Sequence, residues 1–338
     1  MSSVKASAPA PQIESDTDMK NSCWHRSRSG SFSMVAQATL LLLTFGCATG
    51  GGTHSVESPS SEPRTVTVVS LNLRYDNAGD GVNRWRNRKT AVIDALRSFD
   101  ADFLGLQEAL PHQAAAIRSA FPSYAMLIRT READSGQGEA TPILWRTDRW
   151  TRDPTQHGTF WLSETPSVEG SKSWDSSLPR IATFARLIPV GDTADRTAVW
   201  VYNTHFDHRG PEARRESARL LRTRIEAHAD ASEPVVLMGD FNAVPTSPPI
   251  RSIIAVEEST SAPLFDCWAT QNAGEPRNAT WNGFEVIESG RRIDFVFASG
   301  LDVREATIEH PLVDGRPISD HWPVRVVFDL PSGESRAR

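Results

Sequence analysis

Cysteine is scarce in this chain of 338 residues, which contains only Cys23, Cys47 and Cys267. The first two fall in an N-terminal stretch with the features of an export segment, so one cysteine remains for the folded part of the chain. A single cysteine excludes the disulfide framework that holds many small secreted domains together. We therefore predict that Cys267 acts as a small buried hydrophobic residue.

The sequence also lacks an excess of basic residues. Lysine and arginine together number 36 against 42 aspartates and glutamates, which gives a formal net charge of -6. Tight, sequence-independent binding of nucleic acid depends on a basic surface, so this composition argues against a nuclease. A local basic patch or a divalent cation would offset the acidic balance. The length allows one large core or two small ones, and we favour one catalytic domain.

A long hydrophobic run is missing as well. Residues 34–45 form an apolar stretch of signal-peptide length, well short of the roughly 20 residues that span a bilayer. The stretch ends at Gly46-Cys47 and small residues follow, which resembles a bacterial lipoprotein signal with lipid on the Cys47 thiol. We predict that residues 1–47 are an export segment, with Met19 as an alternative start. Simple secretion and an uncleaved anchor are the alternatives to lipidation.

The rest of the chain divides into three parts. Residues 48–64 are rich in Gly, Ser and Pro and predict a flexible linker. Residues 65–330 form the expected domain, and residues 331–338 are a polar tail. We expect a monomer that contacts a membrane only through a lipid anchor. The expected location is the cell envelope, at the outer membrane or in the periplasm, or outside the cell after secretion.

Hydrophobic periodicity predicts a chain that mixes strands and helices. The first part follows a βαβ-like order, with strands at 65–73 and 101–106 and helices at 88–99 and 111–121. Further strands are expected at 124–128, 142–145, 158–162, 181–189, 197–203, 235–238, 293–298, 303–309 and 324–330. One strongly amphipathic helix covers 211–228. This pattern favours two mixed sheets packed face to face with helices outside.

Six polar clusters lie at the ends of these apolar strands. They are Ser70-Leu71-Asn72, Leu106-Gln107-Glu108, Asn203-Thr204-His205, Gly239-Asp240-Phe241-Asn242, Arg292-Ile293-Asp294 and Ser319-Asp320-His321-Trp322-Pro323-Val324. Together and in this order they resemble the motifs of the endonuclease/exonuclease/phosphatase superfamily. The resemblance spans about residues 65–330. It implies an α/β fold, a four-layered αββα sandwich with two mixed, largely antiparallel sheets, and activity as a divalent-metal-dependent phosphoesterase.

The carboxylates and the amide among these clusters are candidate metal ligands. Asn72 and Glu108 offer hard oxygen atoms of the kind that Mg²⁺ prefers, and Asp320 completes or supports the site. Mn²⁺ is the alternative ion, and the number of metals stays open. A metal at this place would neutralise charge that develops on a phosphoryl oxygen.

The histidines are the candidate proton-transfer groups. His321 and Asp294 resemble the oriented dyad of the superfamily, in which the carboxylate fixes the imidazole tautomer. Asp240 and Asn242 would orient the attacking water, or Asp240 would itself be the base, and the sequence does not decide between His321 and Asp240. His205 matches a second histidine of pancreatic-type deoxyribonucleases, which implies phosphate binding or protonation of the leaving oxygen.

Four further residues are candidates for contact with the substrate. Arg180 precedes a strand and suits a bidentate phosphate clamp, and His208 continues the His205 cluster. Trp85 and Arg88 lie just beyond the loop that follows Asn72. The stretch Trp281-Asn282-Gly283-Phe284 resembles a loop that borders the active site in relatives.

These features predict a phosphoesterase that hydrolyses phosphate mono- or diesters outside the cytoplasm. An extracellular nuclease of the same fold is the alternative, which leaves nucleic acid open as a substrate. A lipid phosphodiesterase ranks third, because no long apolar hairpin appears in the C-terminal half. A non-catalytic binding module on the same scaffold would not require metal ligands and the dyad together.

Overall fold

The computed structural model describes residues 65–133, 136–191, 197–228, 233–256 and 262–330. The predicted export segment at 1–47, the linker at 48–64 and the tail at 331–338 lie outside these ranges. None of the described helices combines the length and the apolar character needed to cross a bilayer.

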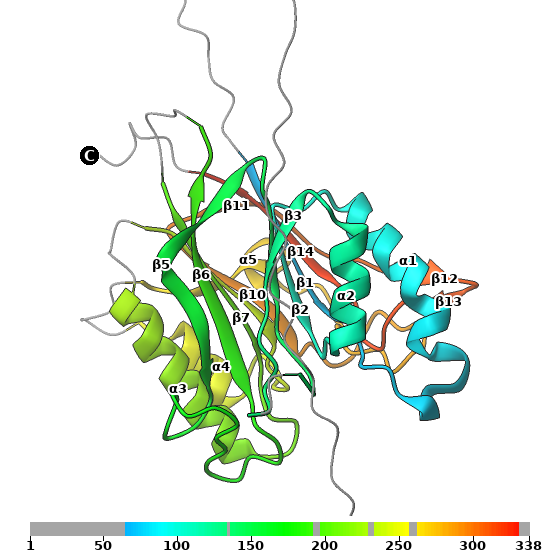
Figure 1. Cartoon of the computed structure of the whole chain (residues 1–338), viewed down its shortest axis with the longest axis horizontal. Helices are drawn as coiled ribbons and strands as arrows, with labels where there is room; N and C mark the ends of the chain where they lie inside the picture. Colours follow the sequence, from blue (N-terminus) through cyan, green and yellow to red (C-terminus); the bar gives the residue numbers. More distant parts are fainter. Residues whose placement is uncertain (1–64, 134–135, 192–196, 229–232, 257–261, 331–338) are drawn as a thin grey trace, which may run out of the picture. The chain divides into compact units, whose positions relative to one another are not determined.

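Two six-stranded sheets form the centre of the domain (Figure 1). The first sheet has the order β11 (Asp302–Ile308), β14 (Val324–Asp329), β1 (Thr65–Asn72), β2 (Phe103–Gln107), β4 (Ile143–Arg146) and β3 (Tyr124–Leu127). The second has the order β5 (Trp150–Trp161), β6 (Ile181–Pro189), β7 (Val199–His205), β8 (Val235–Asp240), β10 (Asp294–Ser299) and β9 (Phe265–Asp266). A short pair, β12 (Leu312–Val313) and β13 (Arg316–Pro317), stands apart from both sheets.

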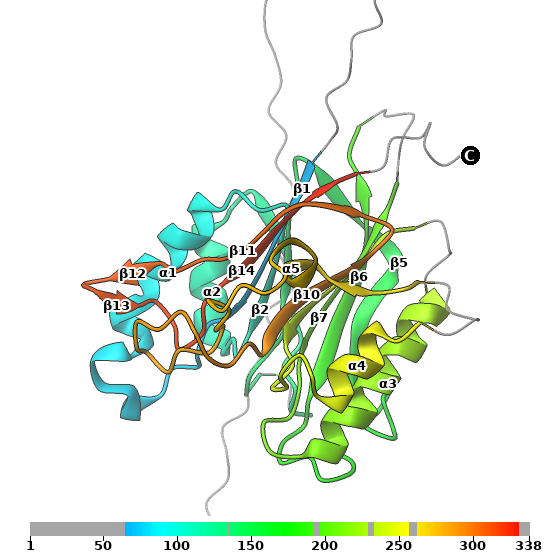
Figure 2. The ribbon, with the colours of Figure 1, turned by 180° about the vertical axis from the view of Figure 1, so that it is seen from behind.

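Four helices cover the outer faces of the two sheets, α1 (Trp85–Ser98) and α2 (Pro111–Ala120) on the first and α3 (Pro211–His228) and α4 (Pro248–Ile254) on the second, as Figures 1 and 2 show from opposite sides. The structure also describes α5 (Cys267–Gln271) and a 3-10 helix η1 (Ala78–Asn83) before α1. Val92 and Leu96 of α1 join the core of β1 and β2, and Leu221 and Ile225 of α3 join the core of β7 and β8. The predicted αββα sandwich is therefore confirmed.

A third hydrophobic core lies between the two sheets. Val68 and Phe103 of the first sheet pack here with Val201 and Met238 of the second. The sheets approach closely at Gly105, where an added Cβ atom would lie 2.6 Å from the Met238 sulfur. Strand β2 is thus buried along its whole length, and β1 is buried on both faces from Val68 to Asn72.

Two parallel strand pairs bring the polar clusters to one edge of the sandwich. In the first sheet β1 pairs with β2 in parallel, with Asn72 opposite Gln107. In the second sheet β7 pairs with β8 in parallel, with His205 opposite Asp240, and antiparallel β10 places Asp294 on the other side of Asp240. Each parallel pair needs a helical crossover, supplied by α1 and α3, and this makes the carboxyl ends of the paired strands coincide.

Some elements differ from the sequence-based expectation. Helix α1 begins at Trp85 rather than at residue 88, and β5 begins at Trp150 rather than at residue 158. The early part of β5 is polar and carries an irregularity between Arg152 and His157, so it lacks the expected alternation. Helices α4 and α5 were not expected because seven and five residues are too few to establish a helical period. Cys267 is a buried free thiol, as predicted.

Candidate active site

Most of the predicted residues converge on a cavity of about 630 Å³ at the carboxyl ends of the parallel strands. Eight of them line it directly: Glu108, Arg180, His205, His208, Asp240, Asn242, Asp320 and His321. Asn72 and Asp294 lie behind this lining and bond to it, Asn72 to Asp240 and Asp294 to His321. The structure thus brings together predicted residues that lie up to 249 positions apart in the sequence, Asn72 and His321 being the two extremes.

His321 and Asp294 form the predicted dyad. Nδ1 of His321 donates to Oδ2 of Asp294 over 2.8 Å, and both side chains are buried. Burial acts to lower the pKa of His321, but the carboxylates of Asp294 and Asp240 outweigh it and raise the pKa well above its ordinary value. Because Nδ1 is committed to Asp294, the ring presents Nε2 toward Asp240, at 3.8 Å from its Oδ2.

Asp240 occupies the centre of the site. Its Oδ1 accepts the backbone N–H of Asn242 over 2.8 Å, and its Oδ2 accepts the amide of Asn72 over 3.1 Å. Burial raises the pKa of Asp240 to about 7, and the charge of Asp294 acts in the same direction while that of His321 opposes it. A carboxylate with a pKa near neutrality can both accept and release a proton under ordinary conditions.

A second group of carboxylates faces the cavity from the first sheet. Glu108 stands just after β2 with a positive φ of 56°, and its two oxygens accept the side-chain amide of Asn72 and the backbone N–H of Tyr75, over 3.1 and 3.0 Å. Burial raises the pKa of Asp320, and the charge of Glu108 raises it further against the opposing charges of His321 and Arg74. The negative charges of Glu108 and Asp320 repel each other across the cavity. A divalent cation that prefers oxygen ligands would relieve this repulsion, so the pair is suited to bind one.

The amide of Asn72 is engaged by neighbouring protein groups, and its role as a metal ligand stays a prediction. Its Oδ1 accepts the backbone N–H of Arg74 over 2.9 Å, while its Nδ2 donates to both Glu108 and Asp240. The amide oxygen is therefore turned away from Glu108. In this structure Asn72 holds the carboxylates of Glu108 and Asp240, and Glu108 and Asp320 are the carboxylates that face the cavity from the side of the first sheet.

Three side chains of the second sheet also satisfy the geometry of a small cation site. Asp240, Asp294 and His321 each offer one ligand atom, and these atoms all lie within 4.8 Å of one another. The 2.8 Å hydrogen bond between His321 and Asp294 already uses one atom of each. We therefore regard this group as the acid-base centre and the pair of Glu108 and Asp320 as the better metal position.

Arg180 determines which ring nitrogen carries the proton in both remaining histidines, His205 and His208. It is buried, and its two terminal nitrogens lie 3.0 Å from Nδ1 of His205 and 3.0 Å from Nδ1 of His208. A guanidinium can only donate, so Nδ1 of each ring must accept and Nε2 must carry the proton. Burial lowers the pKa of His205 well below its ordinary value, and the charge of Arg180 lowers it further.

His205 is consequently a neutral hydrogen-bond donor. Its Nε2–H can donate to Oδ2 of Asp240, which lies 3.5 Å away inside the cavity. The amide nitrogen of Asn242 lies 3.1 Å from the same Nε2 but is itself a donor, and it donates to the backbone carbonyl of Phe206 over 3.1 Å. Of the two roles expected from the sequence, donation to a phosphoryl oxygen agrees with this state. Transfer of a proton from a cationic His205 does not, because the neighbouring guanidinium disfavours the cation.

Trp85 and Arg88 do not reach the cavity, which corrects the expectation that they contact substrate. Trp85, the first residue of α1, packs into the hydrophobic core between this helix and the first sheet, and Arg88 is 1% exposed. The guanidinium of Arg88 donates to the backbone carbonyls of Leu73 and Ile318 over 2.9 and 2.6 Å. Both residues continue the apolar stripe of Val92 at helical spacing, which was the signal in the sequence that placed them inward.

Sequence reasoning missed several residues that line the cavity. Arg131 and Glu139 approach each other from the two sides of one loop, with a 2.7 Å contact between them. Burial raises the pKa of Glu139 to about 7, with the charge of Glu108 acting in the same direction. Arg74 and Arg291 also face the cavity. Loop residues of this kind follow no periodic pattern, so nothing in the sequence marked them.

Trp281 borders the cavity, as the sequence predicted for its loop. Its side chain is 37% exposed, and its backbone forms an isolated bridge with His321. This pairing connects the loop directly to the acid-base centre.

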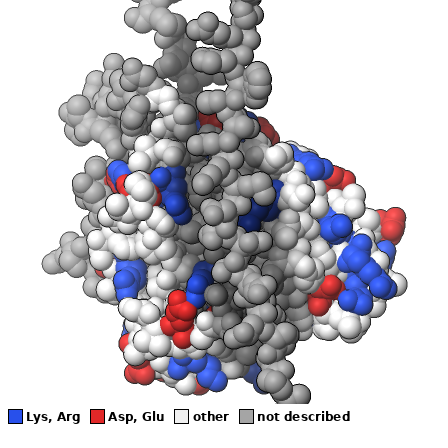
Figure 3. All heavy atoms as spheres, in the orientation of Figure 1, with Lys and Arg blue, Asp and Glu red and all other residues white. Residues whose placement is uncertain are grey.

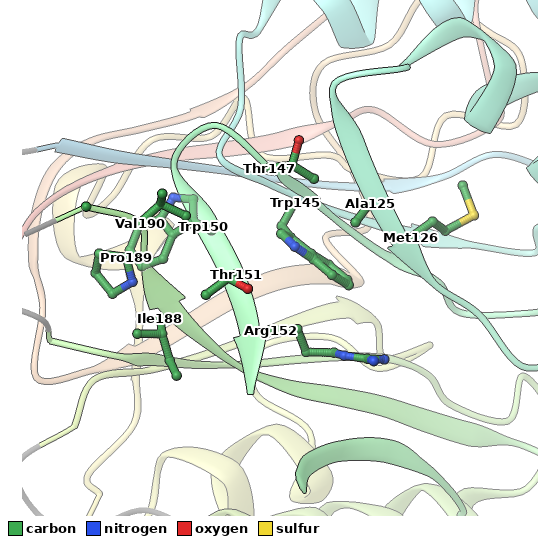
Figure 4. Close-up of a pocket in the computed structure, with 11 residues that line it drawn as sticks. Ala125, Met126, Trp145, Thr147, Trp150, Thr151, Arg152, Ile188, Pro189 and Val190 are labelled. Atoms are coloured by element: carbon green, nitrogen blue, oxygen red, sulfur yellow. The ribbon is translucent and has the colours of Figure 1, made fainter. Parts of the chain in front are cut away.

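A larger cavity of about 830 Å³ lies elsewhere, between β3 and β4 on one side and β5 and β6 on the other (Figure 4). Trp145, Trp150 and Ile188 are among the residues that line it, and Arg152 is the one charged residue among its described lining residues. A cavity without convergent acids, bases or ligands offers no chemistry of its own. The smaller cavity is therefore the candidate active site.

Comparison with known families and structures agrees with this assignment. A model described as the Endonuclease/Exonuclease/phosphatase family matches residues 69–321. Among curated proteins, Protein angel homolog 2 of Danio rerio is 24% identical over 202 residues, which is 56% of this chain and 34% of that protein. This chain thus spans about a third of the length of the curated relative it matches.

Two bacterial structures are more similar. An endonuclease/exonuclease/phosphatase from Bacteroides vulgatus is 31% identical, with a TM-score of 0.70 over 79% of this chain and 100% of that chain. A mannosyl-6-phosphatase from Bacteroides thetaiotaomicron is 30% identical, with a TM-score of 0.66 over 77% of this chain and 98% of that chain.

Proposed function

The chain belongs to the endonuclease/exonuclease/phosphatase family, and from this premise we propose that it is a divalent-metal-dependent phosphoesterase that hydrolyses phosphate esters by attack of water. One observation carries the proposal: Asp240 lies between two imidazole rings, with Nε2 of His205 at 3.5 Å and Nε2 of His321 at 3.8 Å. A proton acceptor flanked by two donors in one cavity is suited to hydrolysis at an anionic centre.

Glu108 and Asp320 would hold the metal, for which we propose Mg²⁺ with Mn²⁺ as the alternative. Their donor set consists of hard oxygen atoms, and the mutual repulsion of the two carboxylates fits a cation between them. When bound, the ion supplies positive charge that offsets the negative charge developing on the phosphoryl oxygens.

The residues of the chain perform the proton transfers. Asp240 accepts a proton from the attacking water, the new P–O bond forms, and the ester P–O bond breaks. His205 donates its Nε2 hydrogen to a phosphoryl oxygen, and Arg180 keeps that hydrogen in place. His321, oriented by Asp294, gives its Nε2 proton to the departing oxygen.

For the substrate we propose a phosphomonoester of a small polar molecule such as a sugar. The 30% identity with a mannosyl-6-phosphatase supports this choice, because that protein is named for such a substrate. Basic and acidic side chains are interspersed over the described part of the face in Figure 3, which does not favour a long polyanion. A nuclease therefore remains the second candidate.

Phosphate release from the full chain tests the proposal. The panel contains a hexose 6-phosphate, a small phosphodiester and single- and double-stranded DNA, each with Mg²⁺, Mn²⁺ or EDTA. We expect metal-dependent turnover of the monoester and a fall of about 10²–10⁴ in kcat for His321→Ala. His112→Ala, which alters an exposed histidine on α2, is the matched control. If the wild-type protein shows no metal-dependent turnover on any member, the proposal fails.

We also propose that the chain is exported and carries lipid on Cys47. The support is the apolar stretch at 34–45 followed by Gly46-Cys47. Cells fed labelled palmitate should label the wild-type protein and not Cys47→Ser, and equal labelling of the two would overturn lipidation at this residue.

A further inference from the structure

A second cavity of about 570 Å³ adjoins the candidate active site. Asn242 and Arg291 line both spaces, so the two cavities meet at these residues. The second space is bounded by the first turn of α3 and by the loop before α4, from Ala243 to Ser247. Because Nδ2 of Asn242 lies 3.1 Å from Nε2 of His205, the junction is immediately beside a donor of the acid-base centre.

Two arginines of the second cavity have no carboxylate partner in the described part of the chain. Among the described residues, neither Arg214 nor Arg291 lies within 4.0 Å of a carboxylate oxygen. Arg214 donates from one terminal nitrogen to the backbone carbonyl of Asp207 over 2.8 Å, which leaves its other N–H groups available. Burial lowers the pKa of Arg214, and the positive charge of Arg291 lowers it further against the charges of two aspartates.

The other charged residues of the cavity are already neutralised or engaged. Arg215 forms ion pairs with Glu212 and Glu216. The carboxylate of Asp175 accepts the backbone N–H groups of Ala213 and Glu212 over 2.7 and 3.3 Å at the start of α3. The two arginines without carboxylate partners therefore give the cavity its positive character.

Arg291 also has an aromatic neighbour on the side of the active site. Its guanidinium carbon lies 5.6 Å from the ring centroid of Trp281, which is 37% exposed and lines the first cavity. The indole thus presents a flat surface next to the junction, suited to the apolar face of a sugar or another ring. A molecule lying on this surface would reach both cavities.

We propose that the second cavity binds a second phosphate group of the substrate, held by Arg214 and Arg291 while the scissile phosphate lies at His205 and His321. The preferred substrate class is therefore a small bisphosphorylated molecule, such as a sugar bisphosphate. This inference rests on the proposed hydrolysis at the first cavity. Guanidinium groups bind phosphate oxygens in bidentate pairs, so two arginines that line one space without a carboxylate partner within 4.0 Å among the described residues can hold a phosphate group there.

Turnover of glucose 6-phosphate and glucose 1,6-bisphosphate by the full chain with Mg²⁺ tests the clamp. We expect the wild-type protein to have a kcat/KM at least tenfold higher for the bisphosphate. Arg214→Gln, whose side chain lines the second cavity and not the first, should reduce that advantage by about tenfold to a hundredfold and leave turnover of the monophosphate unchanged. Arg219→Gln is the matched control, because it removes the same charge from α3 at an exposed position outside both cavities.

Equal kcat/KM for the two sugars, or equal losses in Arg214→Gln and Arg219→Gln, would overturn the second phosphate site while leaving the hydrolase intact. If neither sugar is hydrolysed, a binding measurement distinguishes a failure of the proposed hydrolysis from a failure of the second phosphate site. Calorimetry on His321→Ala should then show tighter binding of glucose 1,6-bisphosphate than of glucose 6-phosphate, and Arg214→Gln in the same background should abolish the difference. No difference in binding would refute the clamp independently of turnover.

Discussion

Arg88 provides the sharpest test of how the site is held in place. Its guanidinium donates four hydrogen bonds, to the backbone carbonyls of Asn83, Leu73, Ile318 and Arg74. Leu73 follows Asn72, and Ile318 precedes Asp320 by two residues, so the buried side chain ties together the two segments that carry these site residues. Burial lowers its pKa to about 10, which shows that the charge is poorly solvated.

Arg88→Met keeps an unbranched apolar chain in place of the arginine stem and removes all the donors of the guanidinium. The carbonyls of Leu73 and Ile318 accept buried bonds and would lose this partner, at a cost of about 1–3 kcal/mol each. The variant no longer buries a charge, which recovers part of that cost. We expect the free energy of unfolding to fall by about 2–4 kcal/mol, equivalent to roughly 4–16 °C in Tm.

Urea unfolding of the full chain, followed by tryptophan fluorescence, measures this change. Arg86→Met is the matched control, because Arg86 is exposed on the same helix and its replacement should change stability by less than about 0.5 kcal/mol. Equal changes in the two variants would refute the structural role of Arg88. A normal stability of Arg88→Met with a raised KM would restore the original expectation that this residue contacts substrate.

Two further predictions concern the acid-base centre and its support. Asp294→Asn should lower kcat by about 10²–10⁴ with a nearly unchanged KM, because the 2.8 Å bond orients His321 without touching substrate, and steady-state kinetics decides this. Burial acts to raise the pKa of Asp207, but hydrogen bonds from Gly210, Ser177 and Arg209 hold it below its ordinary value. Asp207 therefore contributes fully to the free energy of unfolding at pH values above its pKa in the unfolded chain, which is about 3.9. This contribution is lost as the pH falls through its lower pKa in the folded protein. The stability difference between wild type and Asp207→Asn should therefore shrink between pH 6 and pH 2.5, and a constant difference in denaturation experiments would contradict this.

The sequence was most informative where strand geometry determines position. Asn72, His205 and Asp240 end apolar strands, and parallel pairing makes such ends coincide, so their convergence followed from the pattern alone. The pattern could not reveal how the groups are oriented within the site. Whether Asn72 turns its oxygen or its nitrogen toward Glu108 depends on the backbone N–H of Arg74, which is a tertiary contact.

Loops account for most of what was not predicted. Arg131 and Glu139 meet across an irregular segment, and Arg291 precedes β10 in a stretch without alternation. Their positions depend on where each loop returns to the sheets, which no local propensity specifies. Trp85 and Arg88 are a different case, because their helical spacing relative to Val92 did indicate an inward orientation. Arg88 is a charged residue on this apolar stripe, and the prediction wrongly placed it in contact with substrate.

The division of the site between the two sheets has a consequence for the assembly of the protein. Glu108 follows a strand of the first sheet, whereas His205, Asp240 and Asp294 lie on strands of the second. Neither half carries a complete set, and the halves meet only once Gly105 has seated against Met238 in the core between them. Turnover therefore requires both sheets to be packed together, and a change that separates them would abolish hydrolysis even if each sheet kept its own strands.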